Sequence, residues 1–591
     1  MADSADARLA VAARYRGLAK LNSAREEIRL IRVTGLPCET GAAITLDMMT
    51  VSLQDDLEYD ALSYAWGDLR PTHVANVDGL GLPITQNLYD AMCVLGRPGV
   101  LSKPLWIDAL CIQQDDLEER SQQVAMMGKI YRRATNVRVW LGLPGPDTAT
   151  ALKTLHVNTL SNLVQLWSQN DELARGIDDL MQRSWWHRLW VLQEVGDGKT
   201  AVAHCGELTI KWLQLARFAS SLLVARLRFA EYQERRFRSL GLRALASAHD
   251  RKVWDYYHLK SYGIPFSAVE TFRLCATFYC SDHRDKVYGL LNLLPTGFRM
   301  RADYTLPLAK IYEQATAEAI RVEENLSILS MAGLYTSKSS HLASWVPDLS
   351  NIYPLEDREM VSEVLQPCAF AGAMFRSTAL GYGRLQVRGL VVDSCRIRCD
   401  AREAFATAAT EHRPQESILS RCRCILRYWR SMAIATCTNQ TIAVTVQQFW
   451  RVALDDVHTF DESHRTALCE RWLDGDDETT TFAALGLLES QLIEWCERIA
   501  FFVTVSGKLG FAARPSVAAG DQIAVLAGIR RPVFIKPGEF HGSAGYRLVT
   551  TCRCDGKYSV ARVTIDGIDS SLQASCGVKQ YEAQPSTSRV Y

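Results

Sequence analysis

The pattern of apolar and polar positions over residues 105–141 organises the first half of the chain. Leu105-Trp106-Ile107 is an apolar run that ends at an acid, Asp108. Asp115 or Asp116 can cap a helix that follows, with a glutamate three residues further on. One face of that helix is apolar at helical spacing: Leu117, Val124, Met127, Tyr131 and Ala134. A second strand over 137–141 completes a predicted βαβ unit with parallel strands, in which Asp108 lies at the carboxyl end of a strand, where such sheets bind ligands.

Strands and helices alternate on both sides of this unit. The apolar patterning predicts strands at 28–33, 44–53, 59–66 and 200–204, and helices at 83–95, 150–175 and 183–194. The last of these helices is densely aromatic. This alternation from residue 59 to 206 predicts a doubly wound α/β domain with a flavodoxin-like parallel sheet.

The second half of the chain changes character twice. Residues 212–325 read as mainly helical, whereas 365–400 and 501–566 read as short strands, the latter set with glycine turns typical of a small barrel or sandwich. A helical insertion rich in Arg and Trp separates these two strand regions. The predicted limits are an N-terminal arm at 1–25, the α/β domain at 26–210, a helical region at 211–350, a C-terminal β domain at 351–401 plus 501–566, the insertion at 402–500 and a disordered tail at 567–591.

Composition narrows the class of protein. A chain of 591 residues is too long for one core, and its formal net charge of zero argues against a nucleic-acid partner. No apolar run reaches the length of a membrane span, and the first twenty residues lack the apolar core of a signal peptide. The 17 cysteines therefore predict reduced thiols in the cytoplasm. Their close pairs lack zinc spacing, and the chain has neither a phosphate loop nor a dinucleotide fingerprint, so we predict no metal and no bound cofactor.

Glu194 is the first candidate for chemistry. It lies four residues after Trp190 on the predicted aromatic helix, beside Trp185 and Trp186. Arg183, His187 and Arg188 place positive charge nearby. A carboxylate in such surroundings can stabilise an oxocarbenium-like centre and hold sugar hydroxyls. The alternative is that Glu194 only pairs with an arginine and that the tryptophans are plain core, which is the commoner role of such residues.

Asp108 is the second candidate. With Arg120 and Gln123 on the following helix it can form the polar floor of a ligand site. The alternative is a buried Asp–Arg pair that joins strand to helix. Cys111 lies close by, but no neighbouring histidine is there to activate it, so we do not expect a thiolate nucleophile.

Several motifs together resemble the heterokaryon incompatibility (HET) domain of filamentous fungi. The residues that carry the resemblance are Tyr59 to Asp68, Leu105 to Ile112, Glu119-Arg120, Gln123-Val124, Ile130-Tyr131, Arg183 to Glu194, Asp285 to Leu291 and Ser344 to Asp348. Phe502 to Gly510 and Gly520-Asp521 resemble the C-terminal part that often accompanies the domain. Gln113 departs from the pattern, because family members often carry Asp or Asn there.

The resemblance implies a role in non-self recognition, in which the domain triggers growth arrest and cell death when incompatible hyphae fuse. The HET domain is also similar to the TIR domain, which implies that Glu194 is the catalytic acid of an NAD⁺ glycohydrolase. NAD⁺ would then be a substrate rather than a cofactor. The substrate-binding residues implied in this way are Trp66, Asp108, Arg120, Arg188 and Trp190.

Two other functions stay open at this stage. The α/β domain can be a non-enzymatic adaptor that self-associates or binds a protein partner and so recruits a death effector. Some relatives lie beside secondary-metabolite genes, so an accessory role in a metabolite cluster is the third reading. The sequence holds nothing similar to the nucleotide-binding or repeat domains of large incompatibility receptors, so we expect another chain to supply the trigger.

Overall fold

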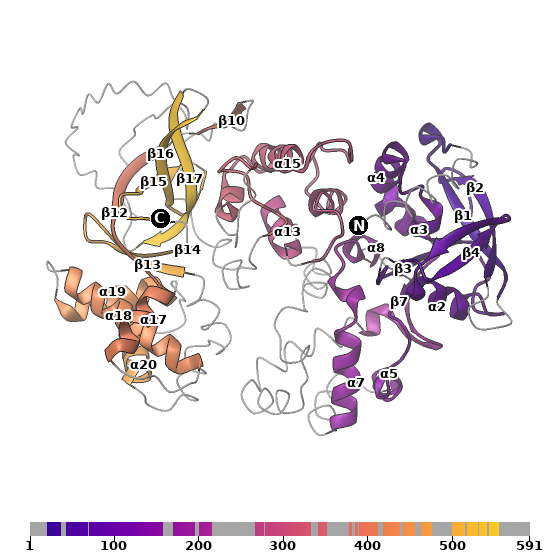
Figure 1. Cartoon of the computed structure of the whole chain (residues 1–591), viewed down its shortest axis with the longest axis horizontal. Coiled ribbons are helices and arrows are strands. Elements are labelled where there is room, and N and C mark those ends of the chain that lie inside the picture. Colours follow the sequence, from indigo (N-terminus) through magenta and orange to yellow (C-terminus); the bar gives the residue numbers. More distant parts are fainter. Residues whose placement is uncertain are drawn as a thin grey trace, which may run out of the picture.

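The computed structural model describes residues 20–36, 43–68, 70–157, 170–195, 200–215, 266–276, 278–332, 341–351, 377–380, 384–387, 389–411, 418–437, 441–454, 462–474, 499–513, 517–526, 528–529, 531–540 and 543–554. Figure 1 shows a sheet domain and a barrel at opposite ends of the molecule, with helices between them. The predicted N-terminal arm to residue 19, the helical stretch 216–265 and the C-terminal tail lie outside the described residues.

The described N-terminal part is built on a nine-stranded sheet. Its strands, in spatial order, are β5 (Leu80–Ile84), β4 (His73–Val77), β2 (Ile44–Ser52), β1 (Glu27–Gly35), β6 (Leu105–Trp106), β3 (Asp60–Tyr64), β7 (Asn136–Trp140), β8 (Ala201–Cys205) and β9 (Leu208–Lys211). The block β6-β3-β7-β8 is parallel throughout. Numbered along the chain, these four strands follow the order 2-1-3-4, which is the flavodoxin-like order.

The α/β prediction is therefore confirmed, with a sheet that is mixed rather than wholly parallel. The hairpin β1–β2 joins β6 antiparallel through β1, and the hairpin β4–β5 extends that side of the sheet. At the other side β9 turns back antiparallel on β8. In Figure 1 the helices α2 (Gln86–Leu95) and α4 (Leu117–Arg133) lie on opposite sides of the sheet.

Helix α4 follows the predicted pattern with two differences. Asp116 is its N-cap and accepts hydrogen bonds from the N–H groups of Glu118 and Glu119. The reciprocal half of the expected capping box is missing, because the Glu119 carboxylate binds the buried Arg29 of β1 instead. Leu117, which the spacing placed on the buried face, is 40 % exposed, because it is the first residue of the helix.

Residues 183–194 do not form the single helix that the sequence pattern predicted. Ser184–His187 is one turn of 3-10 helix, and α8 (Val191–Val195) begins only after a break. At the break Arg188 is extended and bridges Tyr279, with the Leu189 N–H donating to the Tyr279 carbonyl at 3.0 Å. A backbone pairing across ninety residues of sequence thus replaces the local helical hydrogen bonds.

The region after the sheet contains short helices and then the barrel. The helices are α13 (Ala268–Cys275), α14 (Asp285–Tyr288) and α15 (Leu308–Glu323), followed by the 3-10 turn η4 (Ser327–Met331). The barrel is closed in the order β12 (Gly389–Asp400), β13 (Ile499–Thr504), β14 (Leu509–Ala513), β17 (Ser543–Cys554), β16 (Val533–Phe540) and β15 (Gln522–Leu526). The predicted C-terminal β domain is thereby confirmed.

The helical insertion lies between β12 and β13. Its described helices are α17 (Ala401–Glu411), α18 (Ile418–Thr436), α19 (Ile442–Leu454) and α20 (Glu462–Asp474). They pack on the barrel through a core that includes Trp429, Phe449, Phe501 and Phe511. A larger core joins the sheet, the helices α13 to α15 and one side of the barrel, so these parts share buried surface.

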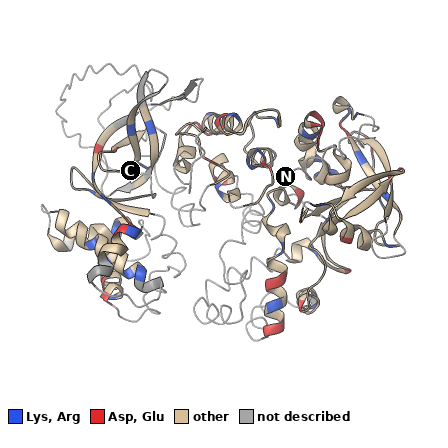
Figure 2. Cartoon of the chain, viewed as in Figure 1, with Lys and Arg blue, Asp and Glu red and all other residues tan. Residues whose placement is uncertain are grey.

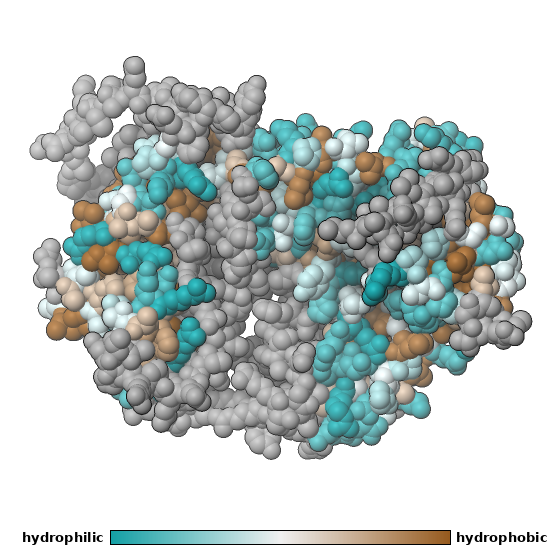
Figure 3. Space-filling model, viewed as in Figure 1, coloured by the Kyte–Doolittle hydropathy of each residue, from teal (hydrophilic) through white to brown (hydrophobic). Residues whose placement is uncertain are grey.

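Charge is mixed along some of the described helices and of one sign on others, such as α18, whose sequence holds four arginines and no acidic residue. Figure 2 shows basic and acidic residues interspersed, for example along α7 (Asp171–Met181), in agreement with the net charge of zero. On the face drawn in Figure 3, hydrophilic and hydrophobic residues are intermixed over the described surface. Of the helices that the structure describes, none has the length and apolar character to cross a membrane.

Candidate functional site

Glu194 of α8 lies against the carboxyl end of strand β3 and is 2 % exposed. The Ser63 hydroxyl on β3 donates a hydrogen bond to Glu194 Oε2. Ser63 in turn accepts a hydrogen bond from the Trp185 indole Nε1 at 2.8 Å. The Glu194 carboxylate is therefore held at the carboxyl end of a central parallel strand by the Ser63 hydroxyl, and the Trp185 indole in turn positions that hydroxyl.

Arg188 connects Glu194 with Asp108. Its Nη1 lies 3.6 Å from Glu194 Oε1, and its Nη2 lies 3.9 Å from Asp108 Oδ2. The same guanidinium donates to the backbone carbonyl of Tyr64, the last residue of β3. The Arg188 side chain is 16 % exposed and that of Glu194 only 1 %, so the cluster meets solvent on the arginine side.

Asp108 begins a four-residue helix, α3 (Asp108–Cys111), directly after β6. Its Oδ2 accepts a hydrogen bond from the Trp66 indole at 2.8 Å, and its Oδ1 accepts one from the Ala109 N–H at 2.8 Å. The Tyr64 side chain lies close enough to this carboxylate to oppose the rise that burial causes in its pKa. Since β6 and β3 are neighbours, the two strand ends bring Asp108 and Glu194 to one edge of the sheet.

Burial controls the protonation of both carboxyl groups. It raises the pKa of Glu194 to about 7, although the charge of Arg188 and the hydrogen bond from Ser63 oppose the rise. Burial also raises the pKa of Asp108, against the same arginine and the Trp66 hydrogen bond. Glu194 thus exchanges a proton near neutral pH, which a solvated glutamate does not do.

Two of the predicted binding residues lie elsewhere. Arg120 does not contact Asp108; its Nη2 lies 3.3 Å from Asp282 Oδ2 and 3.8 Å from Asp285 Oδ1. The Trp190 side chain lies close enough to Asp285 to oppose the rise that burial causes in the pKa of that carboxyl group, so Trp190 and Glu194 do not share a face as the helical spacing had implied. The structure brings together Trp66, Asp108, Arg188 and Glu194, and it separates Arg120 and Trp190 into a second cluster around Asp285.

Ser63 and Tyr64 are members of the site that the sequence reasoning missed. Their position at the carboxyl end of a predicted strand was the available signal, because ligand sites in parallel sheets gather there. Cys111 behaves as expected, since burial raises the pKa of its thiol to about 12 and so disfavours a thiolate. Gln123 donates to the Glu27 carbonyl and stays outside the cluster.

The chemistry available to this cluster follows from its charges. Two buried carboxyl groups flank one guanidinium, so an ionised Glu194 is stabilised locally and can in turn stabilise a cationic centre that comes within contact distance. Within the described residues no group of three or more His, Cys, Asp or Glu side chains is placed to hold a metal ion.

The fold and the cluster together define an α/β domain of flavodoxin-like strand order with a buried acidic pair at the carboxyl edge of its sheet. The sequence model of a family described as heterokaryon incompatibility protein (HET) matches residues 59–194, which run from the start of β3 to Glu194 itself. Over this stretch the chain is similar to the HET domain of fungal heterokaryon incompatibility proteins.

One similar relative is heterokaryon incompatibility protein 6, OR allele, of Neurospora crassa. The two chains are 26 % identical over 399 residues, which is 56 % of this chain and 58 % of the relative. The match thus spans little more than half of that protein. No solved structure matches this chain to a significant degree.

Proposed function

We propose that this protein acts in fungal non-self recognition and triggers cell death by cleaving NAD⁺ with the Glu194 site. The observation that carries the proposal is the placement of Glu194: buried, paired with Arg188, and at the carboxyl edge of β3 where the strand order reverses. The match to heterokaryon incompatibility proteins supports the biological role.

In the proposed reaction the bond between nicotinamide and the ribose breaks, and its electron pair leaves with the nicotinamide nitrogen. The ionised Glu194 stabilises the oxocarbenium-like ribose and holds its hydroxyls. Water then adds to the ribose carbon and releases one proton, so the products are nicotinamide, ADP-ribose and a proton. The charge of Arg188 favours the ionised form of Glu194, and its partly exposed guanidinium is suited to bind the diphosphate of NAD⁺. Trp66 and Asp108 lie at the same edge of the sheet.

The test is release of nicotinamide from NAD⁺ by the full-length protein at high concentration. We expect Glu194→Gln, which preserves the shape of the side chain, to reduce the rate by roughly a hundredfold or more. The matched control is Glu207→Gln, because Glu207 is an exposed glutamate that pairs with Arg97 at the surface. Equal rates for the wild type and Glu194→Gln would refute the proposal.

One observation favours a second function, that of a non-enzymatic adaptor. Glu194 is fully engaged by Ser63 and Arg188 and is 2 % exposed, so a substrate reaches it only if these contacts rearrange. In the adaptor case the α/β domain would self-associate or bind a protein partner in the cytoplasm and recruit the death effector. Growth arrest that persists in cells expressing Glu194→Gln would favour the adaptor over the enzyme.

A further inference from the structure

The helix that carries Glu194 is too short to position it alone. Helix α8 has five residues, Val191–Val195, fewer than an isolated helix needs to be stable in water. The 3-10 turn before it ends at His187, so the connection over residues 188–190 is not helical. The orientation of the Glu194 side chain therefore depends on contacts from elsewhere in the chain.

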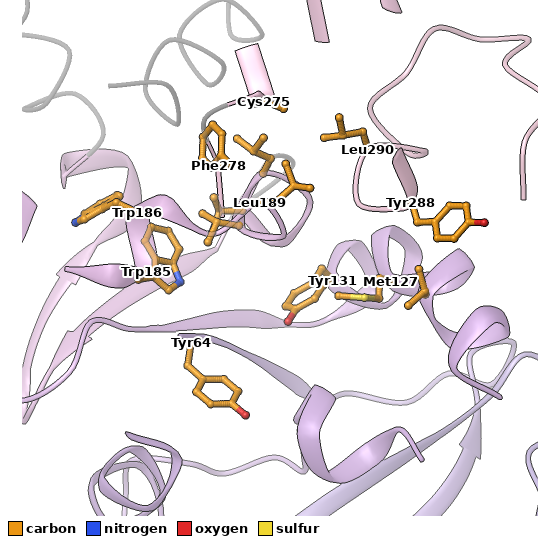
Figure 4. Packing of buried hydrophobic residues seen from close by; sticks show 14 of the residues in the cluster. Tyr64, Met127, Tyr131, Trp185, Trp186, Leu189, Cys275, Phe278, Tyr288 and Leu290 are labelled. Carbon is orange, nitrogen blue, oxygen red and sulfur yellow. The ribbon is translucent and has the colours of Figure 1, made fainter. Parts of the chain in front are cut away.

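Those contacts come from residues 279–292, which lie beyond the end of the HET match at residue 194. The first is the backbone bridge at Tyr279, whose N–H donates to the His187 carbonyl at 2.5 Å and whose carbonyl accepts from the Leu189 N–H. Figure 4 shows Leu189 close to Phe278, which directly precedes this region, and on the same side as Leu290 within it. The Leu189 side chain packs so closely that a Cβ added at Gly289 would lie 3.0 Å from its Cδ2.

The second contact holds Gln193, the residue directly before Glu194. Gln193 is 5 % exposed and donates from Nε2 to the Gly289 carbonyl at 2.6 Å. Its Oε1 accepts a hydrogen bond from Asn292 Nδ2 at 3.0 Å. Asn292 reaches this position because Gly128 of α4 lacks a side chain: a Cβ there would lie 2.8 Å from the Asn292 amide.

The third contact holds Trp190, whose carbonyl accepts the Glu194 N–H at 3.1 Å. The Trp190 side chain lies close enough to Asp285 to oppose the rise that burial causes in the pKa of its carboxyl group, and the Tyr304 hydroxyl donates a hydrogen bond to Asp285 Oδ1 at 2.5 Å. Arg120 lies over the Tyr304 ring, with its guanidinium carbon 3.8 Å from the ring centroid. Arg120 and Trp190 therefore lie outside the Glu194 cluster, because both contact the group formed by Asp285 and Tyr304.

We propose that residues 279–292 form a clamp that positions Glu194, so that the working site extends past the HET match into the following helical region. The clamp contacts residues 187, 189, 190 and 193, whereas the side chains of Arg188 and Glu194 form hydrogen bonds with residues of β3. Asn292 and Asp285 are positioning residues, since neither touches the reacting groups. The catalytic consequence of the clamp rests on the proposed NAD⁺ cleavage, but its structural consequence does not.

The first variant is Asn292→Ala in the full-length chain. We expect amide hydrogen exchange over residues 187–195 to rise by roughly fivefold or more, while exchange in β3 and β7 stays unchanged. For nicotinamide release we expect kcat to fall by roughly 10- to 100-fold with little change in KM, because the catalytic group is misplaced and binding groups are not. The control is Asn325→Ala. The Asn325 side chain donates a hydrogen bond to the Glu323 carbonyl and accepts one from the Ser327 N–H, so these bonds go to neighbours in sequence rather than to residues 187–195.

The second variant displaces Asn292 without changing it. Gly128→Ala places a methyl group against the Asn292 amide, while alanine itself favours the α4 helix. We expect Gly128→Ala to reproduce the exchange and kcat effects of Asn292→Ala, and the double variant to be no worse than Asn292→Ala alone.

Unchanged exchange over 187–195 in both single variants would overturn the clamp. Faster exchange in a protein whose wild type cleaves no NAD⁺ would support the clamp and overturn the proposed function. A fall in kcat without faster exchange, or a loss expressed only in KM, would count against positioning by the clamp.

Discussion

Arg188 Nη1 lies 3.6 Å from Glu194 Oε1, and the charge of this arginine opposes the effect of burial on the carboxyl group. Without it the pKa of Glu194 would rise above its present value of about 7. We therefore expect Arg188→Met to move the acid limb of the pH–rate profile for nicotinamide release to higher pH, with Arg188→Lys intermediate. Arg97→Met, at an exposed ion pair, serves as the control. A profile that does not move would contradict the assigned role of Arg188.

Glu194 also predicts a pH dependence of stability. Its pKa is about 7 in the folded state against an ordinary value of 4.5, so the folded state keeps a proton that the unfolded state loses. The corresponding stability is complete below pH 4.5 and is lost as the pH rises through 7. Relative to Glu194→Gln, the wild type should lose about 1–3 kcal/mol of unfolding free energy between pH 4.5 and 7.5. Urea unfolding at both pH values measures this difference, and parallel curves for the two proteins would refute it.

The Arg29–Glu119 pair predicts a large loss of stability when one partner is removed. Arg29 is 2 % exposed and makes two hydrogen bonds to the Glu119 carboxylate, at 2.5 and 2.9 Å. Glu119→Gln leaves a buried charge without its partner and should cost about 3–5 kcal/mol in urea unfolding. Asp68→Asn, at the exposed pair with Arg70, should leave the midpoint unchanged. If the two variants unfold alike, the pair does not contribute as described.

His204 predicts sensitivity to acid. It is 3 % exposed on β8, and burial, with a smaller effect from the Arg138 charge, lowers its pKa from 6.5 to about 4. Between pH 6.5 and 4 the unfolded state binds a proton at this histidine and the folded state does not. The free energy of unfolding therefore falls as the pH falls through this range. His204→Phe should remove about 2–3 kcal/mol of this decline. Thermal unfolding at pH 7 and 4.5 tests it, and an equal decline in both proteins would exclude His204 as the cause.

Much of the fold could be predicted because its signals are local. The strand at 59–66, the helix beginning at Asp116 and the strand at 137–141 each carry their own periodicity or cap, and each appears within a few residues of its expected place. The barrel strands could be recognised for the same reason. The mixed character of the sheet could not be predicted, because β1 joins β6 antiparallel through a pairing of residues distant in sequence, Ile31 and Leu105.

The candidate site could be predicted in part. Asp108, Arg188 and Glu194 were identified from their chemical type near strand ends and aromatic residues, and they do lie together. Trp190 was grouped with them because helical spacing was assumed for residues 183–194, and Arg120 because it lies on the helix that follows Asp108. The bridge between Arg188 and Tyr279 breaks that spacing and turns Trp190 toward Asp285.

The sequence by itself determined the α/β alternation, the cap of α4, the buried character of the aromatic segment and the motifs that resemble a HET domain, since all of these depend on neighbours in the chain. Only the tertiary structure decided which face Glu194 presents, that Ser63 and Arg188 hold it, and that Gln193 is gripped by Gly289 and Asn292. The physical reason is that a five-residue helix has too few internal hydrogen bonds to set its own orientation, so partners almost a hundred residues away set it instead.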